Sequence, residues 1–239
     1  MKKVLPIGLC VALFSSVLFA RGPQEHRGFY FSAGIGPAYH SFYATSSSNT
    51  YRYTWNYSKD AYDYEPIKKK EESTYDAFVF PAFDFRIGKS IGNFVAIYTT
   101  FDFMFDTGNW DATYTQHNEM YDYESTKTAD KKNSVLISGG GGLGFDIYPF
   151  LNPNSLFRGF HIGESSSLNG MFIETIGDRV GKGEGVFLAN RINVGMDWWV
   201  SETWSLGVEF SYTFFNEFDV GDDDVDRHLF RVMFRLTRG

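Results

Sequence analysis

The sequence predicts an all-β fold: a transmembrane, up-and-down antiparallel β-barrel of eight strands. Three observations support this prediction. Segments with strict apolar–polar alternation recur along the chain, as in "WSLGVEFSYTFF" at Trp204–Phe215, and such alternation indicates strands with one apolar face. Tight turns and long polar connections separate these segments. Aromatic residues make up 19% of the chain although its mean hydropathy is negative, a combination typical of an aromatic-rich barrel rather than a helical membrane protein.

The start of the chain has the features of a secretory signal peptide. Lys2 and Lys3 precede a short apolar run that closes on Ala20. The single cysteine, Cys10, falls within this run, so no disulfide is expected in the mature chain. The predicted organisation is a signal peptide at residues 1–20, a short N-terminal segment at residues 21–27 and the barrel domain at residues 28–239.

The first four candidate strands alternate clearly. They are "GFYFSAGIGPAYHSFY" (Gly28–Tyr43), "TYDAFVFPAFDFRIG" (Thr74–Gly88), "FVAIYTTFDFMF" (Phe94–Phe105) and "SVLISGGGGLGFDIY" (Ser134–Tyr148). The glycines of the fourth segment suit the strongly curved wall of a small barrel.

The last four candidate strands complete the set. They are Gly159–Glu174, "GVFLANRINVGMDWWV" (Gly185–Val200), Trp204–Phe215 and "RHLFRVMFRLTR" (Arg227–Arg238). The phase of Gly159–Glu174 stays open, because its apolar residues follow no single parity. Most of the eight segments are long enough to cross a bilayer when tilted.

The connections alternate between short and long. Lys89–Asn93 and Ser201–Thr203 are tight turns, and Pro149–Arg158 is somewhat longer. Four polar connections lie between them, two long and two shorter: Ala44–Ser73, Asp106–Asn133, Ile176–Glu184 and Asn216–Asp226. Short turns at one end and long loops at the other are typical of a transmembrane barrel.

The placement of charge distinguishes a lipid-facing barrel from a soluble one. Lysines after residue 20 fall only in the predicted connections, at positions 59, 68, 69, 70, 89, 127, 131, 132 and 182. The water-facing wall of a soluble barrel would carry lysine freely. We therefore expect the apolar faces to contact lipid, with these side chains pointing outward: Val208, Phe210, Ile192, Val194, Phe230 and Phe234.

The charged residues within the strands are mainly arginine and acidic residues on the polar face. The interior of an eight-stranded barrel is just wide enough for side chains, and arginine forms bidentate ion pairs in confined spaces. The sequence thus predicts a structural charge network that fills the lumen rather than a pore or a catalytic site. Its predicted members are Asp84, Arg86, Asp146, Arg191, Asp197, Glu209, Arg231 and Arg235.

From Gly28 to Gly239 the pattern resembles the small eight-stranded outer-membrane barrels, such as the transmembrane domain of OmpA and OmpX. The resemblance implies the outer membrane of a Gram-negative-type bacterium, with the lipid bilayer as partner and extracellular loops. A formal charge of −7, or −9 without Lys2 and Lys3, argues against binding nucleic acid.

Two alternatives to a structural or surface-interaction role stay open. Some small barrels of this kind are lipid-modifying enzymes with serine, histidine and an acid at the rim. His40, Ser41, Asp226 and His228 would meet where the first and last strands close the barrel; otherwise they are polar rim residues. The other alternative is a narrow carrier for small hydrophobic molecules.

No cofactor or metal is predicted. "DVGDDDVD" at Asp219–Asp226 clusters carboxylates that could bind calcium, but it lacks the spacing of an EF-hand, and acidic runs are usually only solvated.

The most suggestive feature of the connections is aromatic. "YRYTWNY" places Tyr51, Tyr53, Trp55 and Tyr57 on one parity, and "YDY" occurs at Tyr62–Tyr64 and again at Tyr121–Tyr123. Such residues pack across a hairpin. They also form recognition surfaces, because Tyr and Trp give a large contact area at low entropic cost. The sequence therefore predicts extracellular hairpins with a possible surface ligand, and the two interpretations are compatible.

Overall fold

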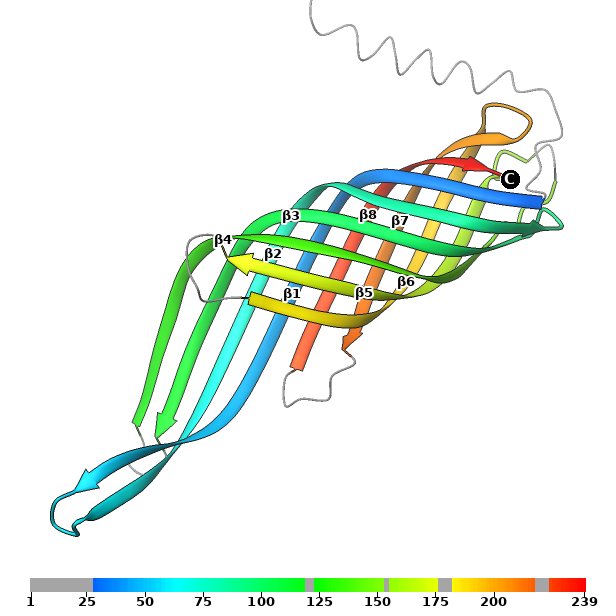
Figure 1. The fold of residues 1–239 in the computed structure, drawn as a ribbon. Helices are drawn as coiled ribbons and strands as arrows, with labels where there is room; N and C mark the ends of the chain where they lie inside the picture. The colour runs from blue at the N-terminus through cyan, green and yellow to red at the C-terminus, as the bar shows by residue number, and fades with distance from the viewer. Residues whose placement is uncertain (1–27, 119–122, 153–154, 176–181, 218–223) are drawn as a thin grey trace, which may run out of the picture.

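The computed structural model describes residues 28–118, 123–152, 155–175, 182–217 and 224–239. Eight strands close into one barrel in chain order, and every neighbouring pair is antiparallel (Figure 1). The strands are β1 (Gly28–Asn56), β2 (Ala61–Ile91), β3 (Val95–Asn118), β4 (Tyr123–Ile147), β5 (Phe160–Thr175), β6 (Lys182–Trp199), β7 (Trp204–Glu217) and β8 (Asp224–Arg238). The predicted fold class is confirmed. The predicted signal peptide and N-terminal segment lie outside the described residues.

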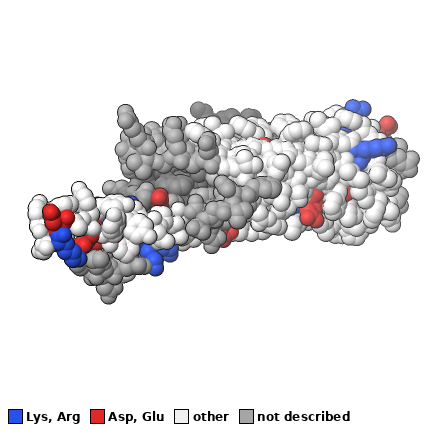
Figure 2. All heavy atoms as spheres, turned by 60° about the horizontal axis from the view of Figure 1, so that its bottom comes forward, with Lys and Arg blue, Asp and Glu red and all other residues white. Residues whose placement is uncertain are grey.

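The wall of the barrel is apolar on its outside and polar on its inside. The predicted outward residues Phe210, Ile192, Val194, Phe230 and Phe234 are between 40% and 60% exposed. Arg86, Asp84 and Glu209, by contrast, are completely buried. In the face shown in Figure 2, basic side chains gather toward the two ends and the wall between them is mostly uncharged. Such an inverted distribution is stable only where hydrocarbon surrounds the wall, so the barrel is a transmembrane one.

The ends of the barrel differ, as the sequence predicts. Between β2 and β3, Phe94 N–H donates to the Ile91 carbonyl at 3.1 Å across Gly92 and Asn93. Both central residues have positive φ, 60° and 58°. Positive φ at both positions defines a type I′ turn, whose twist matches that of the flanking strands. We call this end of the barrel the turn end and the opposite end the loop end. Of the described residues, none forms a helix long and apolar enough to span a membrane.

The strands at the loop end are longer than predicted. β1 and β2 pair continuously up to Asn56↔Ala61, and β3 and β4 up to Asn118↔Tyr123. Ala44–Ser73 and Asp106–Asn133, which the sequence predicts as long polar connections, are therefore mostly strand, and the hairpin predicted from the alternating aromatic residues is the extension of β1 and β2. Strands were predicted from apolar–polar alternation, which requires an apolar face. These extensions lie beyond the apolar wall, where no such face is required. In Figure 1 the β1–β2 hairpin reaches farthest from the barrel; we call residues 46–56 and 61–71 the hairpin projection.

The longer strands also change the interpretation of the lysines. The prediction that no lysine falls within a strand is wrong, because Lys59 alone lies in a turn. Six of the others lie in the extensions of β2 and β4, at positions 68, 69, 70, 127, 131 and 132. Lys89 and Lys182 lie near strand ends.

The structure fixes the phase of β5. Ser165, Ser167 and Asn169 point inward and are buried, whereas Glu164 and Ser166 point outward and are exposed. Ser166 donates to Asn190 Oδ1 of β6 at 2.8 Å, also on the outer face. Because both faces of this stretch carry polar residues, alternation could not reveal its orientation.

Candidate functional site

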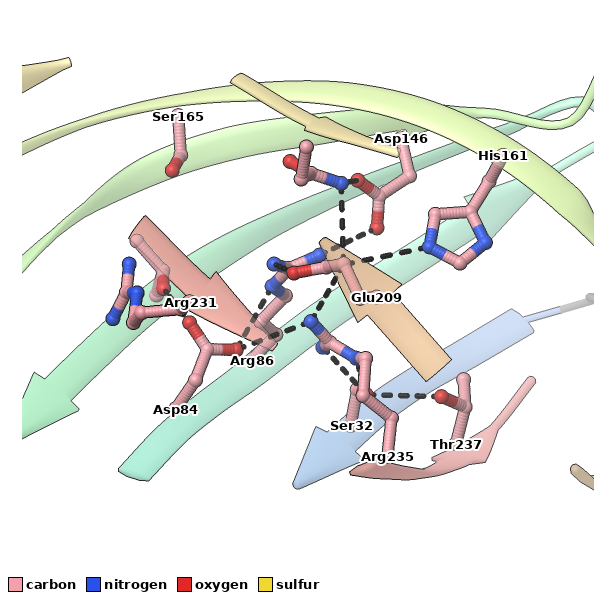
Figure 3. A network of polar contacts seen from close by, with 12 residues as sticks. Ser32, Asp84, Arg86, Asp146, His161, Ser165, Glu209, Arg231, Arg235 and Thr237 are labelled. Carbon is pink, nitrogen blue, oxygen red and sulfur yellow. Dashed lines mark hydrogen bonds and ion pairs between the residues drawn. The ribbon is translucent and has the colours of Figure 1, made fainter. Parts of the chain in front are cut away.

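The lumen is occupied by a network of charged side chains centred on Arg86 of β2 (Figure 3). Its Nε donates to Asp84 Oδ1 at 3.1 Å, its Nη1 to Asp146 Oδ2 at 2.9 Å and its Nη2 to Glu209 Oε1 at 2.7 Å. All four side chains are fully buried. Because a guanidinium group is planar with donors on three nitrogens, this one arginine connects β2, β4 and β7.

Two further arginines share these carboxylates. Arg235 Nη1 lies 2.8 Å from Glu209 Oε2 and 3.3 Å from Asp84 Oδ1. Arg191 contacts Asp84 Oδ2, and its Nη2 lies 3.2 Å from Asp102 Oδ1. Six of the eight predicted network residues are thus joined directly, and Asp102 adds a carboxylate that the prediction did not include. Each of these six buried charges thus lies in an ion pair with a charge of the opposite sign, as the high cost of burying an unpaired charge requires.

The other two predicted members stand apart from the Arg86 centre. Asp197 Oδ2 lies 3.9 Å from His161 Nδ1, and His161 Nε2 lies 3.4 Å from Glu209 Oε2. Arg231 is buried, and among the described residues it forms no ion pair; its Nη2 donates only to Thr213 Oγ1, at 3.5 Å.

Several network residues were not found from the sequence. Tyr30 and Tyr98 donate their hydroxyls to Asp146 at 3.1 and 3.0 Å, and Asn193 Nδ2 donates to the same carboxylate at 3.0 Å. His161 also belongs here. The sequence analysis considered only charged residues for the lumen, yet Tyr98 has the same parity as inward Thr100. The alternation of inward and outward positions along β3 was the signal that could have identified Tyr98 as a lumen residue.

Toward the loop end the lumen changes from charged to apolar. Its inner face there carries Phe42, Met104, Leu136, Met171 and Phe215, which are packed in one buried cluster. Arg227 reaches into this cluster from β8.

Arg227 is held by uncharged groups. Its Nε donates to His40 Nε2 at 2.8 Å and its Nη2 to Ser138 Oγ at 3.0 Å. Its guanidinium carbon lies 3.9 Å from the centre of the Phe215 ring, within the range of a cation–π contact.

The four proposed rim residues do not form one cluster. His40 is fully buried inside the barrel, whereas Ser41 and His228 pair across β1 and β8 on the outer side. Both ring nitrogens of His228 are occupied: Nε2 lies 2.8 Å from Asp226 Oδ1, and Nδ1 lies 2.7 Å from the Tyr212 hydroxyl. A serine nucleophile needs a base nitrogen within reach. The arrangement therefore does not match a serine–histidine–acid site.

The hairpin projection carries an exposed run of aromatic side chains on one face, which we call the aromatic ladder: Tyr51, Tyr53, Trp55, Tyr62 and Tyr64. Tyr53 pairs with Tyr64 and Trp55 with Tyr62, with edge-to-face ring centres 5.0 and 4.9 Å apart. Tyr53 is nevertheless 61% exposed and Trp55 38% exposed. Tyr57 is in the turn beyond the ladder and is 90% exposed.

The tip of the projection is closed by a small polar cluster. Asn56 Nδ2 donates to Asp63 Oδ2 at 2.6 Å, and Lys59 Nζ donates to Asp63 Oδ1 at 3.0 Å. The Asn56 hydrogen bond, together with the Lys59 ammonium, holds the pKa of the Asp63 carboxyl below its usual value.

No group of metal-ligating side chains occurs among the described residues. The acidic run Asp219–Asp226 lies largely outside them, and with it the possible calcium site.

The sequence matches no protein-family model and no curated protein. Three solved structures are similar over most of the chain. The outer membrane protease OmpT from Escherichia coli has a TM-score of 0.38 at 8% identity, covering 88% of this chain and 96% of that one. Neisserial surface protein A (NspA) gives 0.38 at 11%, covering 88% and 96%. The outer membrane protein OprG from Pseudomonas aeruginosa gives 0.38 at 12%, covering 90% and 98%.

Proposed function

We propose that this chain is an outer-membrane protein of a Gram-negative-type bacterium that binds an extracellular ligand through its hairpin projection. Residues 1–20 direct export, and the barrel anchors the projection outside the cell. The observation that carries the proposal is the exposed aromatic ladder. Contiguous aromatic surface on a protein usually marks a contact site, and tyrosine and tryptophan dominate such sites.

The edge of the projection supports the same role. β1 pairs with β8 only up to Thr45↔Asp224, so beyond that point its second edge has no strand partner among the described residues. In this free stretch, residues 46–56, Arg52 is the only charged residue. The corresponding stretch of β4, residues 123–133, also lacks a second strand partner among the described residues, and it carries the exposed charges Glu124 and Lys127. Charge on an edge strand opposes pairing with another chain, so β1 is the edge suited to contact a ligand.

The test is a double substitution, Tyr53→Ser with Trp55→Ser. We expect the variant to fold, judged by heat-modifiable gel mobility, and to lose retention on the immobilised polysaccharides or extracellular proteins that hold the wild type. The matched control is Thr50→Ala with Thr54→Ala, on the opposite face of β1 in the same projection. If the double variant binds every tested surface as the wild type does, the ladder only packs the hairpin.

The lumen network supports a second element of the proposal, a barrel closed to ions. Side chains from β2, β4, β6, β7 and β8 meet across the lumen at Arg86, Asp84 and Glu209. Conductance through planar bilayers should therefore show no large, steady channel. A stable open conductance of the wild type would refute the closed lumen.

A narrow carrier for small hydrophobic molecules is the second candidate, supported by one feature of the wall. The β2–β3 ladder stops at Asp76↔Asn109 and resumes at Ala82↔Met104. Ala77 and Val79, within the interrupted stretch, belong to the buried apolar cluster of the lumen. A small hydrophobic molecule would enter the barrel from lipid at this interruption, where the Tyr75 hydroxyl donates to Asp106 Oδ2 at 2.7 Å and joins the two strands.

This candidate predicts that the wild type accelerates uptake of a labelled long-chain fatty acid into vesicles. Ala77→Trp, which fills the inner side of the break, should abolish the acceleration. Phe78→Trp, one residue away on the outer face, is the control. Equal uptake with and without the barrel would remove the carrier function.

A further inference from the structure

We propose that the lumen contains a binding site for one small inorganic anion, a halide such as chloride, beside Arg231. The site lies between the Arg86 network and the apolar loop-end layer. It is independent of ligand binding by the projection.

Two buried arginines of the lumen lack a counter-charge among the described residues. Arg86, Arg191 and Arg235 each contact at least one carboxylate. Within the described part of the chain, neither Arg227 nor Arg231 does, although both are buried. Arginine cannot lose its proton in a protein, so a buried guanidinium without a counter-charge is costly. The neighbouring carboxylates offer little relief: Asp84 is already shared by Arg86, Arg191 and Arg235.

Arg231 also has a buried hydrogen-bond donor that is not used in the described part of the chain. The Nε–H of Arg231 is buried and has no hydrogen-bond partner among the described residues, and the same holds for Nη1 of Arg227. Native proteins leave few buried donors unsatisfied, and an ordered water or ion at the site is a common reason for such an atom.

The size of the cavity beside Arg231 suits a single small occupant. A cavity of about 10 Å³ lies beside Arg231. Its lining combines apolar side chains with these polar and charged ones: Arg231, Arg191, Ser138, Ser167, Asn169, Thr213 and Asp102. A volume of roughly 10–15 Å³ holds one water-sized occupant. Of the common anions only a monatomic ion approaches this size, whereas polyatomic anions such as sulfate or gluconate are too large.

The hydrogen-bond donors that line the cavity favour an anion over water. Three hydroxyls at the cavity already accept a hydrogen bond: Ser138 Oγ from Arg227 at 3.0 Å, Ser167 Oγ from Asn169 at 2.7 Å, and Thr213 Oγ1 from Arg231 at 3.5 Å. Each therefore keeps its own O–H proton to donate. The Asp102 carboxylate also lines the cavity, but Arg191 Nη2 lies 3.2 Å from its Oδ1. Donors thus outnumber free acceptors, as a monatomic anion requires.

The experiment measures the folding equilibrium of the full barrel in detergent micelles by urea titration. Sodium chloride replaces sodium gluconate at constant ionic strength. For one site, a tenfold increase in chloride well above the dissociation constant raises the folding equilibrium constant about tenfold. Bromide should act similarly and sulfate should not. Crystals grown in bromide should show one anomalous scatterer near Arg231.

Two variants make the test specific. Arg231→Met leaves no acid without its ion pair, because Arg231 forms none among the described residues, and it should abolish the chloride dependence. Thr213→Val, nearly isosteric, removes one donor and should weaken chloride binding several-fold. Arg238→Gln, an exposed arginine on the same strand, is the matched control and should keep the full dependence. Equal stability of the wild type in chloride and gluconate, or an undiminished chloride dependence in Arg231→Met, would overturn the proposal.

Discussion

Two ion pairs of nearly equal length lie at opposite extremes of this molecule. Arg86 Nε and Asp84 Oδ1 are 3.1 Å apart in the lumen, and Lys59 Nζ and Asp63 Oδ1 are 3.0 Å apart at the tip of the projection. The lumen side chains are 0% exposed, whereas Lys59 is 65% and Asp63 32% exposed. Distance alone therefore says little about what an ion pair does. Burial decides whether breaking it leaves a charge that water can solvate.

The difference separates the roles of the two regions. In the lumen, the charges joined to Arg86 depend on one another, so this network holds β2, β4 and β7 in one arrangement. In the projection, side chains remain accessible and their contacts are replaceable by water. This division suits the proposed surface recognition, because binding residues work best when a stable scaffold positions them.

The largest effect is expected for Arg86→Met. The substitution leaves Asp84, Asp146 and Glu209 without their shared central cation, and removal of one partner from a buried ion pair costs about 3–5 kcal/mol. The free energy of unfolding, measured by urea titration in lipid vesicles, should fall by that amount. Arg86→Lys should rescue little, because one ammonium group cannot reproduce three directed contacts. Full rescue by lysine would mean that charge alone matters.

A smaller effect is expected for Arg227→Met, also buried. No described carboxylate depends on Arg227, so the substitution removes a cation–π contact and two hydrogen bonds without leaving an unpaired acid. Methionine retains most of the apolar bulk beside Phe215. We expect a loss of about 1–2 kcal/mol in the same titration. A loss as large as that of Arg86→Met would show that solvation of buried arginine, rather than carboxylate pairing, dominates in the lumen.

The fold class could be predicted from the sequence, and so could the strand face on which each candidate network residue lies. Alternation in strands such as Trp204–Phe215 fixed which side chains face inward, and that phase placed Glu209, Arg191 and Arg235 together in the lumen. Where both faces are polar, as at Glu164 and Ser165, alternation carries no phase information. The lengths of the β1 to β4 extensions could not be read from the sequence for a related reason: beyond the apolar wall no apolar face is needed to mark a strand.

Pairing within the lumen could not be predicted from the sequence, because closure of the barrel brings together residues far apart in the chain. Asp146 meets Arg86 and Tyr98 only through the register of β2, β3 and β4. For the same reason the sequence could not show that Arg231 forms no ion pair with a described acid. His40 shows the opposite case: closure of the barrel by the first and last strands predicted a rim site shared with Ser41, but neighbouring strand residues face opposite sides of the wall.

A still smaller effect on global stability is expected for the ladder variant Tyr53→Ser/Trp55→Ser. Both side chains are exposed, and their edge-to-face contacts lie beyond the point where β8 ends. Local opening of such a region is separable from global unfolding. The free energy of unfolding of the barrel should change by less than about 1 kcal/mol, while amide exchange within residues 46–56 speeds up. Global destabilisation comparable to that of Arg86→Met would contradict the separation of the two regions.

The smallest effect is expected at the tip of the projection and depends on pH. The pKa of Asp63 is lowered in the folded hairpin by the Asn56 hydrogen bond and by Lys59. A depressed folded pKa means that the carboxylate stabilises the tip fully above its unfolded pKa, near the ordinary value of 3.8. The contribution disappears as the pH falls through the folded pKa. The Asn56 side-chain amide, followed by NMR, should therefore shift with a midpoint below 3.8. Asp63→Asn should abolish the shift while preserving a hydrogen-bond acceptor. A midpoint at or above 3.8 would show that the ordered tip gives the ionised carboxylate no preference over the unfolded chain.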